Sequence, residues 1–345
     1  MGDYLTKRLR GLGFAVSEDD AGRSMGGNCG NLYAVLEGSL PGEPLLFSAH
    51  MDTVEPSRGK RAVLHKDGTI TSDGSTVLGA DDCAALVALL KALETIRGQG
   101  LAHRTLELVI SVAEEIYCGG ISLFDFSRLR ARECYVLDLT GPVGTAAYAA
   151  PSLVTFEAVI TGRSAHAGFN PEDGAHAIAA AAEAVAGMRM GRVDADTTFN
   201  VGVIEGGRAG NIVPDRCVVR GEARSFSHER ALTELERARD TLARAAVHWG
   251  ASLEFSTSVC CEAYAVPFDH PVVKRFERAC EAVGLPCALE RTFGGSDNNH
   301  FAEYGITGIV LATAMMRCHS CEEYTSAEEL GRIAALTAAL MTSAE

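Results

Sequence analysis

The chain lacks a long apolar run and an excess of positive charge. Its most apolar stretch, Ala177–Met188, is short and is interrupted by Glu183, which argues against a membrane-spanning helix. The 31 basic side chains face 45 acidic ones, and a formal charge of −14 repels phosphates, which argues against nucleic acid as a partner. No long polar tract occurs and 47% of the 345 residues are hydrophobic, which excludes disorder as the main state. We therefore expect a folded, acidic protein with neither membrane nor nucleic-acid partners.

The chain also lacks a disulfide-like cysteine spacing and an apolar signal segment. Its 11 cysteines are an odd number, scattered through a chain too long to need covalent crosslinks. The segment Met1–Val16 is basic and amphipathic rather than apolar, so it does not resemble a secretory signal. Met1-Gly2 with Thr6 fits a loose myristoylation pattern, but Leu5 and Leu9 are explained more simply as the buried stripe of a first helix. The predicted location is the cytoplasm.

The first 140 residues alternate between strand-like and helix-like segments. Strands are expected at Pro44–His50, Thr105–Val112 and Cys134–Leu139, and a helix at Asp81–Arg97. Near-continuous apolar strands separated by helices predict an α/β fold with a mostly parallel sheet that has helices on both faces. Ligands of such sheets bind outside the carboxyl ends of the strands.

The pattern changes near residue 145, which predicts an inserted domain. Period-2 alternation marks strands at Leu153–Gly162 and Arg216–Ser225, and helices are expected at Ala175–Met190 and Ser227–Trp249. These elements indicate a small α+β unit with an open sheet face. The alternation of apolar strands and helices seen in the first 140 residues then returns, with a helix at Pro271–Val283, a strand at Gly308–Met315 and a helix at Ser326–Met341. We expect one domain formed by residues 1–147 and 263–345, with a second domain at 148–262 inserted into it.

Several polar side chains follow predicted strands or open a helix, so they are expected to meet at one end of the sheet. They are His50 and Asp52 in SAHMDTV (48–54), Asp81 in GADD (79–82), Glu114-Glu115, Asp138 and His319. Two histidines with several carboxylates match the ligands of Zn²⁺ or a similar divalent ion. A carboxylate can also bridge two ions ~3.5–4 Å apart, with a nucleophilic water between them.

Each of these features has a simpler explanation when it is taken alone. A His-x-Asp triplet often forms only a local hydrogen bond, and Asp81-Asp82 after Gly79 is typical of a helix N-terminus. The pair Glu114-Glu115 is harder to explain, because adjacent carboxylates repel and need a cation or strong solvation. If the two residues ended a strand, they would point in opposite directions, one toward metal and the other toward substrate. The joint occurrence of the features favours a metal site.

The ordered set of motifs resembles the M20 metallopeptidases. The motifs in the outer segments are SAHMDTV, LGADD, AEE, YVLD and a late histidine followed four residues later by Glu323. Those that resemble the peptidase T-like branch are GRSAHAGFNPEDGAHAI (162–178), GNIVPDRCVVRGEARS (210–225) and GGSDNNHF (294–301), in which Asp297 is expected to anchor a substrate-side loop. The resemblance runs from about residue 30 to 330. It implies a zinc-exopeptidase-like catalytic domain with an inserted α+β dimerisation domain, and hence a homodimer.

The resemblance implies two Zn²⁺ ions per subunit, although Co²⁺ and Mn²⁺ accept the same ligands. One ion would be held by His50, Asp81 and Asp138. The other would be held by Asp81, Glu115 and His319, so that Asp81 bridges the two.

The resemblance also implies roles for five further residues. Asp52 would accept a hydrogen bond from the ring of the metal ligand before it and fix its tautomer. Glu114 would be the general base that deprotonates a metal-bridging water and later protonates the leaving amine. His166 would polarise the scissile carbonyl in the partner subunit's active site, although a turn histidine with no role is the simpler alternative. Asn211 and Arg224 would bind the carboxylate or backbone of the substrate, unless Arg224 is only a surface residue of a strand.

The cysteines beside His319 depart from the family pattern. Three interpretations of Cys318 and Cys321 are open. They are incidental, or they modulate the site or bind its metal wrongly, or they form a redox pair.

The function that this resemblance implies is a dizinc exopeptidase that releases the N-terminal residue of short peptides. Asp rather than Glu at position 138 follows the trend among relatives that accept a free N-terminus. The alternatives are an M20-type carboxypeptidase, a deacylase of N-acyl amino acids, and a non-catalytic metal-binding homologue. Glu114 argues against the last of these, because a protein that only binds metal has no use for an unligated base.

Overall fold

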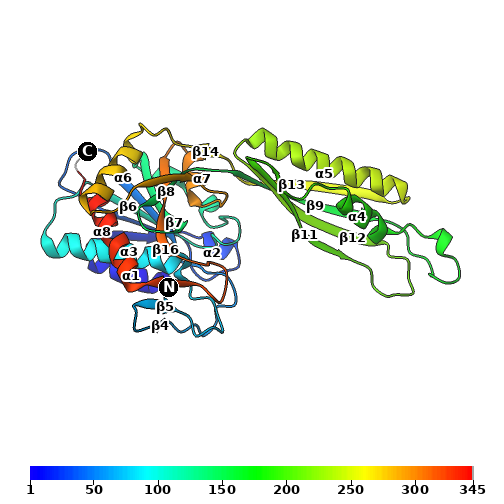
Figure 1. Ribbon diagram of the computed structural model, residues 1–345, viewed down its shortest axis with the longest axis horizontal. Coiled ribbons are helices and arrows are strands. Elements are labelled where there is room, and N and C mark those ends of the chain that lie inside the picture. Colours follow the sequence, from blue (N-terminus) through cyan, green and yellow to red (C-terminus); the bar gives the residue numbers. More distant parts are fainter. Residues whose placement is uncertain (344–345) are drawn as a thin grey trace. The chain divides into compact units, whose positions relative to one another are not determined.

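The computed structural model describes residues 1–343, and the chain divides into two compact units. The first unit contains Met1–Ala150 and the chain from Ala265 onward, and the second is Pro151–Tyr264 (Figure 1). The second unit is therefore an insertion into the first, as the change of pattern near residue 145 indicates.

A central sheet runs through the first unit. Its strands lie in the order β1-β2-β6-β3-β7-β16-β8-β14, with β15 paired to β8. Their bounds are β1 (Ala15–Glu18), β2 (Leu32–Leu36), β3 (Leu45–His50), β6 (Leu106–Ser111), β7 (Glu133–Thr140), β8 (Thr145–Ala150), β14 (Tyr264–Ala265), β15 (Ala288–Arg291) and β16 (Thr307–Met315). The four central strands β6, β3, β7 and β16 are mutually parallel. The predicted mostly parallel α/β sheet is confirmed.

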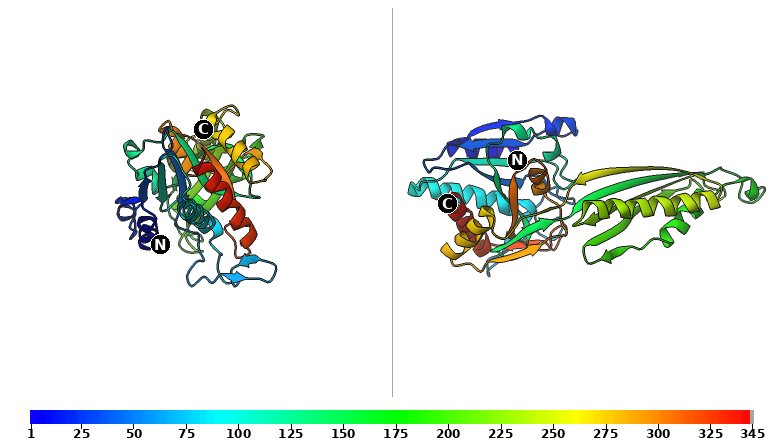
Figure 2. Two further views of the ribbon diagram at one scale, coloured as in Figure 1. Left: turned by 90° about the vertical axis from the view of Figure 1, so that its left-hand side faces the viewer. Right: turned by 90° about the horizontal axis from the view of Figure 1, so that it is seen from above.

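Helices cover both faces of this sheet. The helices of the unit are α1 (Gly2–Gly11), α2 (Ala21–Ser24), α3 (Ala80–Gln99), α6 (Pro271–Ala282), α7 (Asp297–Glu303) and α8 (Ala327–Met341), with the 3₁₀ turns η1 (Ile121–Leu123) and η2 (Phe126–Arg128). Helices α3, α6 and α8 pack against β16, and α8 contacts both α3 and α6, while α7 and η1 cover the other face. Leu5 and Leu9 are buried on α1, as their spacing predicts. A separate small sheet contains β4 (Val63–Leu64), β5 (Thr69–Thr71) and β17 (Tyr324–Ser326), of which β4 and β5 are light blue in Figure 2.

The register of the central strands brings their carboxyl ends to one edge. Every residue of β3 and β6 is buried, and His50 pairs with Ser111 at the end of this parallel ladder. Ser48 pairs with Val136 on the other side of β3, so His50 and Asp138 lie two residues further along neighbouring strands. The loops that follow β3 and β6 therefore begin side by side.

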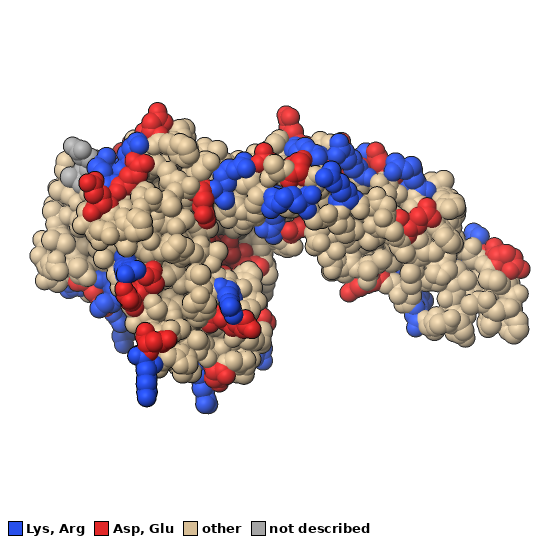
Figure 3. All heavy atoms as spheres, viewed as in Figure 1, with Lys and Arg blue, Asp and Glu red and all other residues tan. Residues whose placement is uncertain are grey.

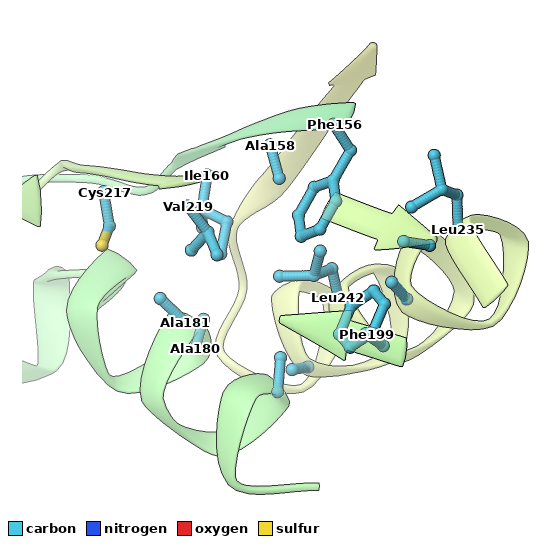
Figure 4. Packing of buried hydrophobic residues seen from close by; sticks show 14 of the residues in the cluster. Phe156, Ala158, Ile160, Ala180, Ala181, Phe199, Cys217, Val219, Leu235 and Leu242 are labelled. Atoms are coloured by element: carbon cyan, nitrogen blue, oxygen red, sulfur yellow. The ribbon is translucent and has the colours of Figure 1, made fainter. Parts of the chain in front are cut away.

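The second unit is a five-stranded antiparallel sheet with two helices on one face. Its elements are β9 (Ser152–Thr161), η3 (Pro171–Asp173), α4 (Ala177–Ala186), β10 (Gly191–Asp194), β11 (Thr197–Gly206), β12 (Arg216–Ser225), α5 (His228–His248) and β13 (Ser252–Cys261), with strand order β10-β11-β12-β9-β13. Alternate residues of β9 and β12, such as Phe156 and Val219, pack against the small residues of α4 and against Leu235 and Leu242 of α5 (Figure 4). The expected α+β unit with an open sheet face is present.

Some boundaries differ from the sequence-based expectation. The helix expected at Ala175–Met190 is only Ala177–Ala186, because His176 caps its start through a hydrogen bond from Ala179 N (3.1 Å) and Gly187 follows its end. Strand β8, with the sequence TAAYAA, was not predicted, because alanine has little intrinsic preference for strands. It forms because it pairs with both β16 and β15.

Charged side chains of both signs are interspersed on the face in Figure 3, with basic ones gathered along α5. Much of this basic stripe is paired with acids: Arg230 contacts Asp194 at 3.1 Å, and Arg237 contacts Glu234 at 2.7 Å. The stripe is thus a solvated helix face with internal ion pairs. None of the helices within residues 1–343 has the length and apolar character needed to cross a bilayer.

Candidate metal centre

Two overlapping groups of possible metal ligands lie at the carboxyl edge of the central sheet. In the first group, His50 Nε2 at the end of β3 lies 3.0 Å from Asp81 Oδ1 and 3.7 Å from Asp138 Oδ1 of β7. All three side chains are almost inaccessible to solvent, with His50 only 1% exposed. An imidazole and two carboxylates in a dry site form a donor set typical of a divalent metal.

The second group shares Asp81 with the first. His319 Nε2 lies 3.2 Å from Asp81 Oδ2 and 2.9 Å from Glu115 Oε2. Each oxygen of the Asp81 carboxylate thus faces a different histidine. This is the arrangement that a carboxylate needs to bridge two cations.

The start of α3 holds Asp81 and Asp82 outside helical geometry. Gly79 is the N-cap residue in a left-handed conformation (φ 73°), and neither aspartate has helical backbone angles. The buried carboxylate of Glu323 accepts hydrogen bonds from Gly79 N (2.6 Å) and Asp81 N (2.9 Å). Asp82 Oδ2 accepts a hydrogen bond from His50 N at 3.1 Å. The simpler interpretation of the two aspartates as N-terminal caps is therefore wrong, because Glu323 caps these amides.

The pair Glu114-Glu115 lies in a turn rather than in a strand. Strand β6 ends at Ser111, and Ala113 then takes a positive φ of 55°, which leads the chain away from the extended direction. The argument that the two glutamates point to opposite faces of a strand is therefore wrong. Asp52 holds the turn instead, because its Oδ1 and Oδ2 accept hydrogen bonds from Glu114 N and Glu115 N, each at 3.2 Å.

Asp52 also lies beside the ring of His50, but its backbone makes the closer contact. His50 Nδ1 is 3.1 Å from the carbonyl oxygen of Asp52 and 3.5 Å from its Oδ1. Either oxygen can accept from a ring N–H and so favour the tautomer with a free Nε2. One residue thus orients a candidate ligand on β3 and fixes the turn that carries Glu114 and Glu115.

We expect Asp52→Ala to lower both kcat/KM and metal affinity by about 10–100-fold, because the turn and the ring lose their common support. Asp52→Asn should fall between wild type and the alanine variant, since its amide keeps one acceptor oxygen for the two N–H groups. Steady-state kinetics and metal content after dialysis measure the two effects. Wild-type values for Asp52→Ala would contradict this role.

The two loops that carry candidate ligands contain unusual backbone angles. Ala113, Tyr117 and Cys118 have φ values of 54–63°, and so do residues after β16, His319 (61°) among them. Non-glycine residues in this region cost about 1–3 kcal/mol each and cluster at functional sites. These backbone angles indicate that function, rather than stability, determines the conformation of both loops.

Crowding of acids and histidines raises the pKa values of both kinds of group at the site. Burial raises the pKa of Glu115 to about 7, with the Asp81 charge adding to the effect. The hydrogen bond to Asp81 raises the pKa of His319 to about 9. Burial acts to lower the pKa of His50, but contacts with Asp138 and other carboxylates raise it well above its usual range. The clustered carboxylates therefore favour positive charge nearby. Protonated histidines provide that charge here, and a bound cation would provide it in their place.

Glu114 belongs to neither of these two ligand groups and is partly buried. Burial raises its pKa well above the usual range, and Asp138 and Asp297 contribute. Cys118 Sγ is 3.4 Å from Glu114 Oε1, and Asp297 completes a third compact group. Asp297, expected to anchor a loop, accepts a hydrogen bond from Ser111 Oγ at the end of β6.

The cysteines near His319 are not part of any ligand group within residues 1–343. Cys318 packs beside Leu78 and Leu330, and burial raises the pKa of its thiol to about 12. Cys321 is partly exposed. This geometry favours the interpretation of both thiols as incidental.

The second unit carries the remaining candidate residues. His166 Nδ1 accepts hydrogen bonds from Gly168 N (3.1 Å) and Phe169 N (3.2 Å), and the ring stacks on that of Phe169. Asn211 lies next to this turn, since its carbonyl accepts from Ala167 N at 3.0 Å.

Arg224 lies apart from this turn, near the far end of β12, in an ion pair with Glu222 (2.7 Å). The structure thus brings His166 and Asn211 together within the unit, whereas Arg224 is not part of that group.

Sequence reasoning missed the contributions of Glu323, Asp82 and Cys118. Glu323 contacts an amide 242 positions away in the sequence, so no local spacing could reveal its capping role. Cys118 follows Glu114 by four residues, but that spacing indicates a contact only in a helix or a tight turn, which the segment EIYCGG did not predict.

Two family models match the chain. The model described as a peptidase dimerisation domain matches residues 148–250. The model of peptidase family M28 matches residues 31–161.

Relatives match almost the whole chain. The protein YqjE of Bacillus subtilis (strain 168), itself described as uncharacterised, is 35% identical over 99% of this chain and 91% of its own length. The crystal structure of aminopeptidase PepT from Bacillus cereus is 36% identical with a TM-score of 0.88. That of a tripeptidase from Staphylococcus aureus is 31% identical with a TM-score of 0.93, and both structures match 99% of this chain and 91% of theirs.

Proposed function

The chain belongs to the M20 metallopeptidases, in their peptidase T-like branch, and we propose that it is a dinuclear zinc exopeptidase that releases the N-terminal residue of short peptides. The names of the two related structures, an aminopeptidase and a tripeptidase, support a small peptide with a free N-terminus as substrate. Asp138, rather than Glu, at this position is consistent with that substrate.

The observation that carries the proposal is the position of Asp81 between two ligand groups. Its two carboxylate oxygens lie 3.0 Å from His50 Nε2 and 3.2 Å from His319 Nε2. Ligand atoms at metal bonds of about 2.0–2.2 Å are separated by similar distances in a tetrahedral site. Glu115 Oε1 is buried and makes no hydrogen bond among the described residues, so its lone pairs are available to coordinate a cation. The residues present therefore fit two divalent ions.

Two bound cations would supply Lewis acidity and would activate water for attack. The chain's own residues do the rest of the chemistry. Glu114, which is left out of both groups, accepts the proton of the attacking water and returns it to the leaving amine. Its partly buried position suits this cycle, because a raised carboxyl pKa brings proton uptake closer to neutral pH.

We assign the second unit to dimerisation and to substrate binding. The dimerisation model that matches residues 148–250 supports a homodimer. In this proposal His166 acts on the scissile carbonyl in the partner subunit, and the two hydrogen bonds to its Nδ1 leave Nε2–H as the donor. Asn211, beside the same turn, and Arg224 are proposed to bind the backbone or carboxylate of the peptide. None of the 11 cysteines forms a disulfide, which supports a reducing compartment such as the cytoplasm.

Metal removal and a peptide panel test this function. We expect a chelator to abolish release of amino acid from free tripeptides, and Zn²⁺, Co²⁺ or Mn²⁺ to restore it. The same metals should raise the melting temperature of the apo protein, because they bind only the folded carboxylate cluster. N-blocked tripeptides serve as the control. Hydrolysis of blocked substrates alone would favour the carboxypeptidase or deacylase alternative.

A further inference from the structure

A third group of metal-binding side chains lies beside the proposed base. Glu114, Cys118 and Asp297 each offer one donor atom, and these atoms lie within 4.8 Å of one another. Cys118 Sγ and Glu114 Oε1 are 3.4 Å apart, a separation typical of two ligands of one ion. Cys118 and Asp297 are only 5% and 2% exposed.

Asp297 supplies an independent sign that this group can bind a cation. One of its carboxylate oxygens, Oδ2, accepts a hydrogen bond from Ser111 Oγ. The other, Oδ1, is buried and has no hydrogen-bond partner among the described residues. A buried carboxylate oxygen without a donor is costly, and a bound cation would satisfy it.

We propose that Glu114, Cys118 and Asp297 form an inhibitory site for a soft divalent cation, namely Cd²⁺ or Zn²⁺ in excess. Thiolate is a soft ligand that favours these ions, whereas Mn²⁺ favours oxygen. On binding, a bond forms between the metal and Cys118 Sγ, and the thiol proton passes to the buffer. The two carboxylates supply oxygen ligands, and water completes the coordination.

Inhibition follows because the cation occupies the carboxylate of Glu114. A carboxylate bound to a cation no longer accepts a proton from the attacking water. This consequence rests on the proposed role of Glu114 as the base, whereas binding to the site does not. Neither of the other two groups contains sulfur, so a cadmium–thiolate signal distinguishes this site from them.

The test is a Cd²⁺ titration of the protein loaded with two equivalents of Zn²⁺. We expect an ultraviolet cadmium–thiolate charge-transfer band that saturates at one equivalent per chain, in parallel with loss of tripeptide hydrolysis. Cys118→Ser should abolish the band and weaken inhibition by at least about tenfold, measured against the activity of the same variant before Cd²⁺ is added. Asp297→Asn, which keeps the shape of the side chain, should weaken Cd²⁺ binding as well.

Cys318→Ser is the matched control, because Cys318 is a partly buried thiol beside the candidate ligand His319 that belongs to no ligand group. It should keep both the band and the inhibition. A band that survives in Cys118→Ser, or that disappears in Cys318→Ser, would overturn the site. A band without inhibition would overturn only its inhibitory role. If the protein hydrolyses no peptide at all, the proposed function fails, while the band and its stoichiometry still test the site.

Discussion

Replacement of Glu114 by Gln is expected to reduce kcat by about 10²–10⁴-fold, because the amide cannot accept the proton of the attacking water. Metal content should stay at two ions per subunit, since Glu114 belongs to neither of the two shared ligand groups. The glutamine keeps the size of the side chain, so the turn held by Asp52 stays in place. Steady-state kinetics on a free tripeptide, with metal analysis of the same sample, measure both quantities.

The neighbouring Glu115→Gln variant is the sharpest comparison. Its carboxylate lies 2.9 Å from His319 Nε2 and belongs to the second ligand group, so this variant should lose one of the two metal ions together with activity. The two variants change adjacent residues by the same single atom. Loss of metal from Glu114→Gln, or wild-type turnover by it, would mean that the roles of the two glutamates are wrongly assigned.

The part of the fold that surrounds the site follows from local patterns. Strands β3, β6, β7 and β16 were predicted because each is an apolar run of ordinary strand length, and parallel strands place their carboxyl ends at one edge. His50 and Asp138 stand at or near the ends of such runs, which is why their proximity could be expected before the structure was known. The start of α3 was also predictable, because Gly79 precedes a helical pattern, and this placed Asp81 near the same edge.

The remainder depends on contacts between distant segments. Nothing local indicates that Glu323 caps the start of α3 or that Asp52 supports the turn of Glu114, because both contacts form only after the loops have folded onto the sheet. The strand interpretation of Glu114-Glu115 failed for a related reason. The positive φ of Ala113 ends the extended geometry, and alanine has no intrinsic preference for that conformation.

Mixing two inactive variants is expected to restore activity if His166 acts across the dimer. His166→Ala alone should lose about 10²–10³-fold in kcat, since it removes one donor to the developing oxyanion. In a dimer of one Glu114→Gln subunit and one His166→Ala subunit, one site keeps both an intact base and the partner's intact histidine. Random exchange of subunits in a two-fold dimer should therefore recover about a quarter of wild-type activity.

This recovery separates action in trans from action in cis. If His166 served its own subunit, each site of the mixed dimer would lack either the base or the histidine, and activity would stay at the level of the inactive parents. Wild-type protein mixed with Glu114→Gln, passed through the same exchange step, controls for losses during handling. A size measurement of the mixture confirms that dimers form. Because the hydrogen bonds from Gly168 and Phe169 orient the ring within its own turn, His166→Ala should leave dimerisation intact, and only the donor to the substrate should be lost.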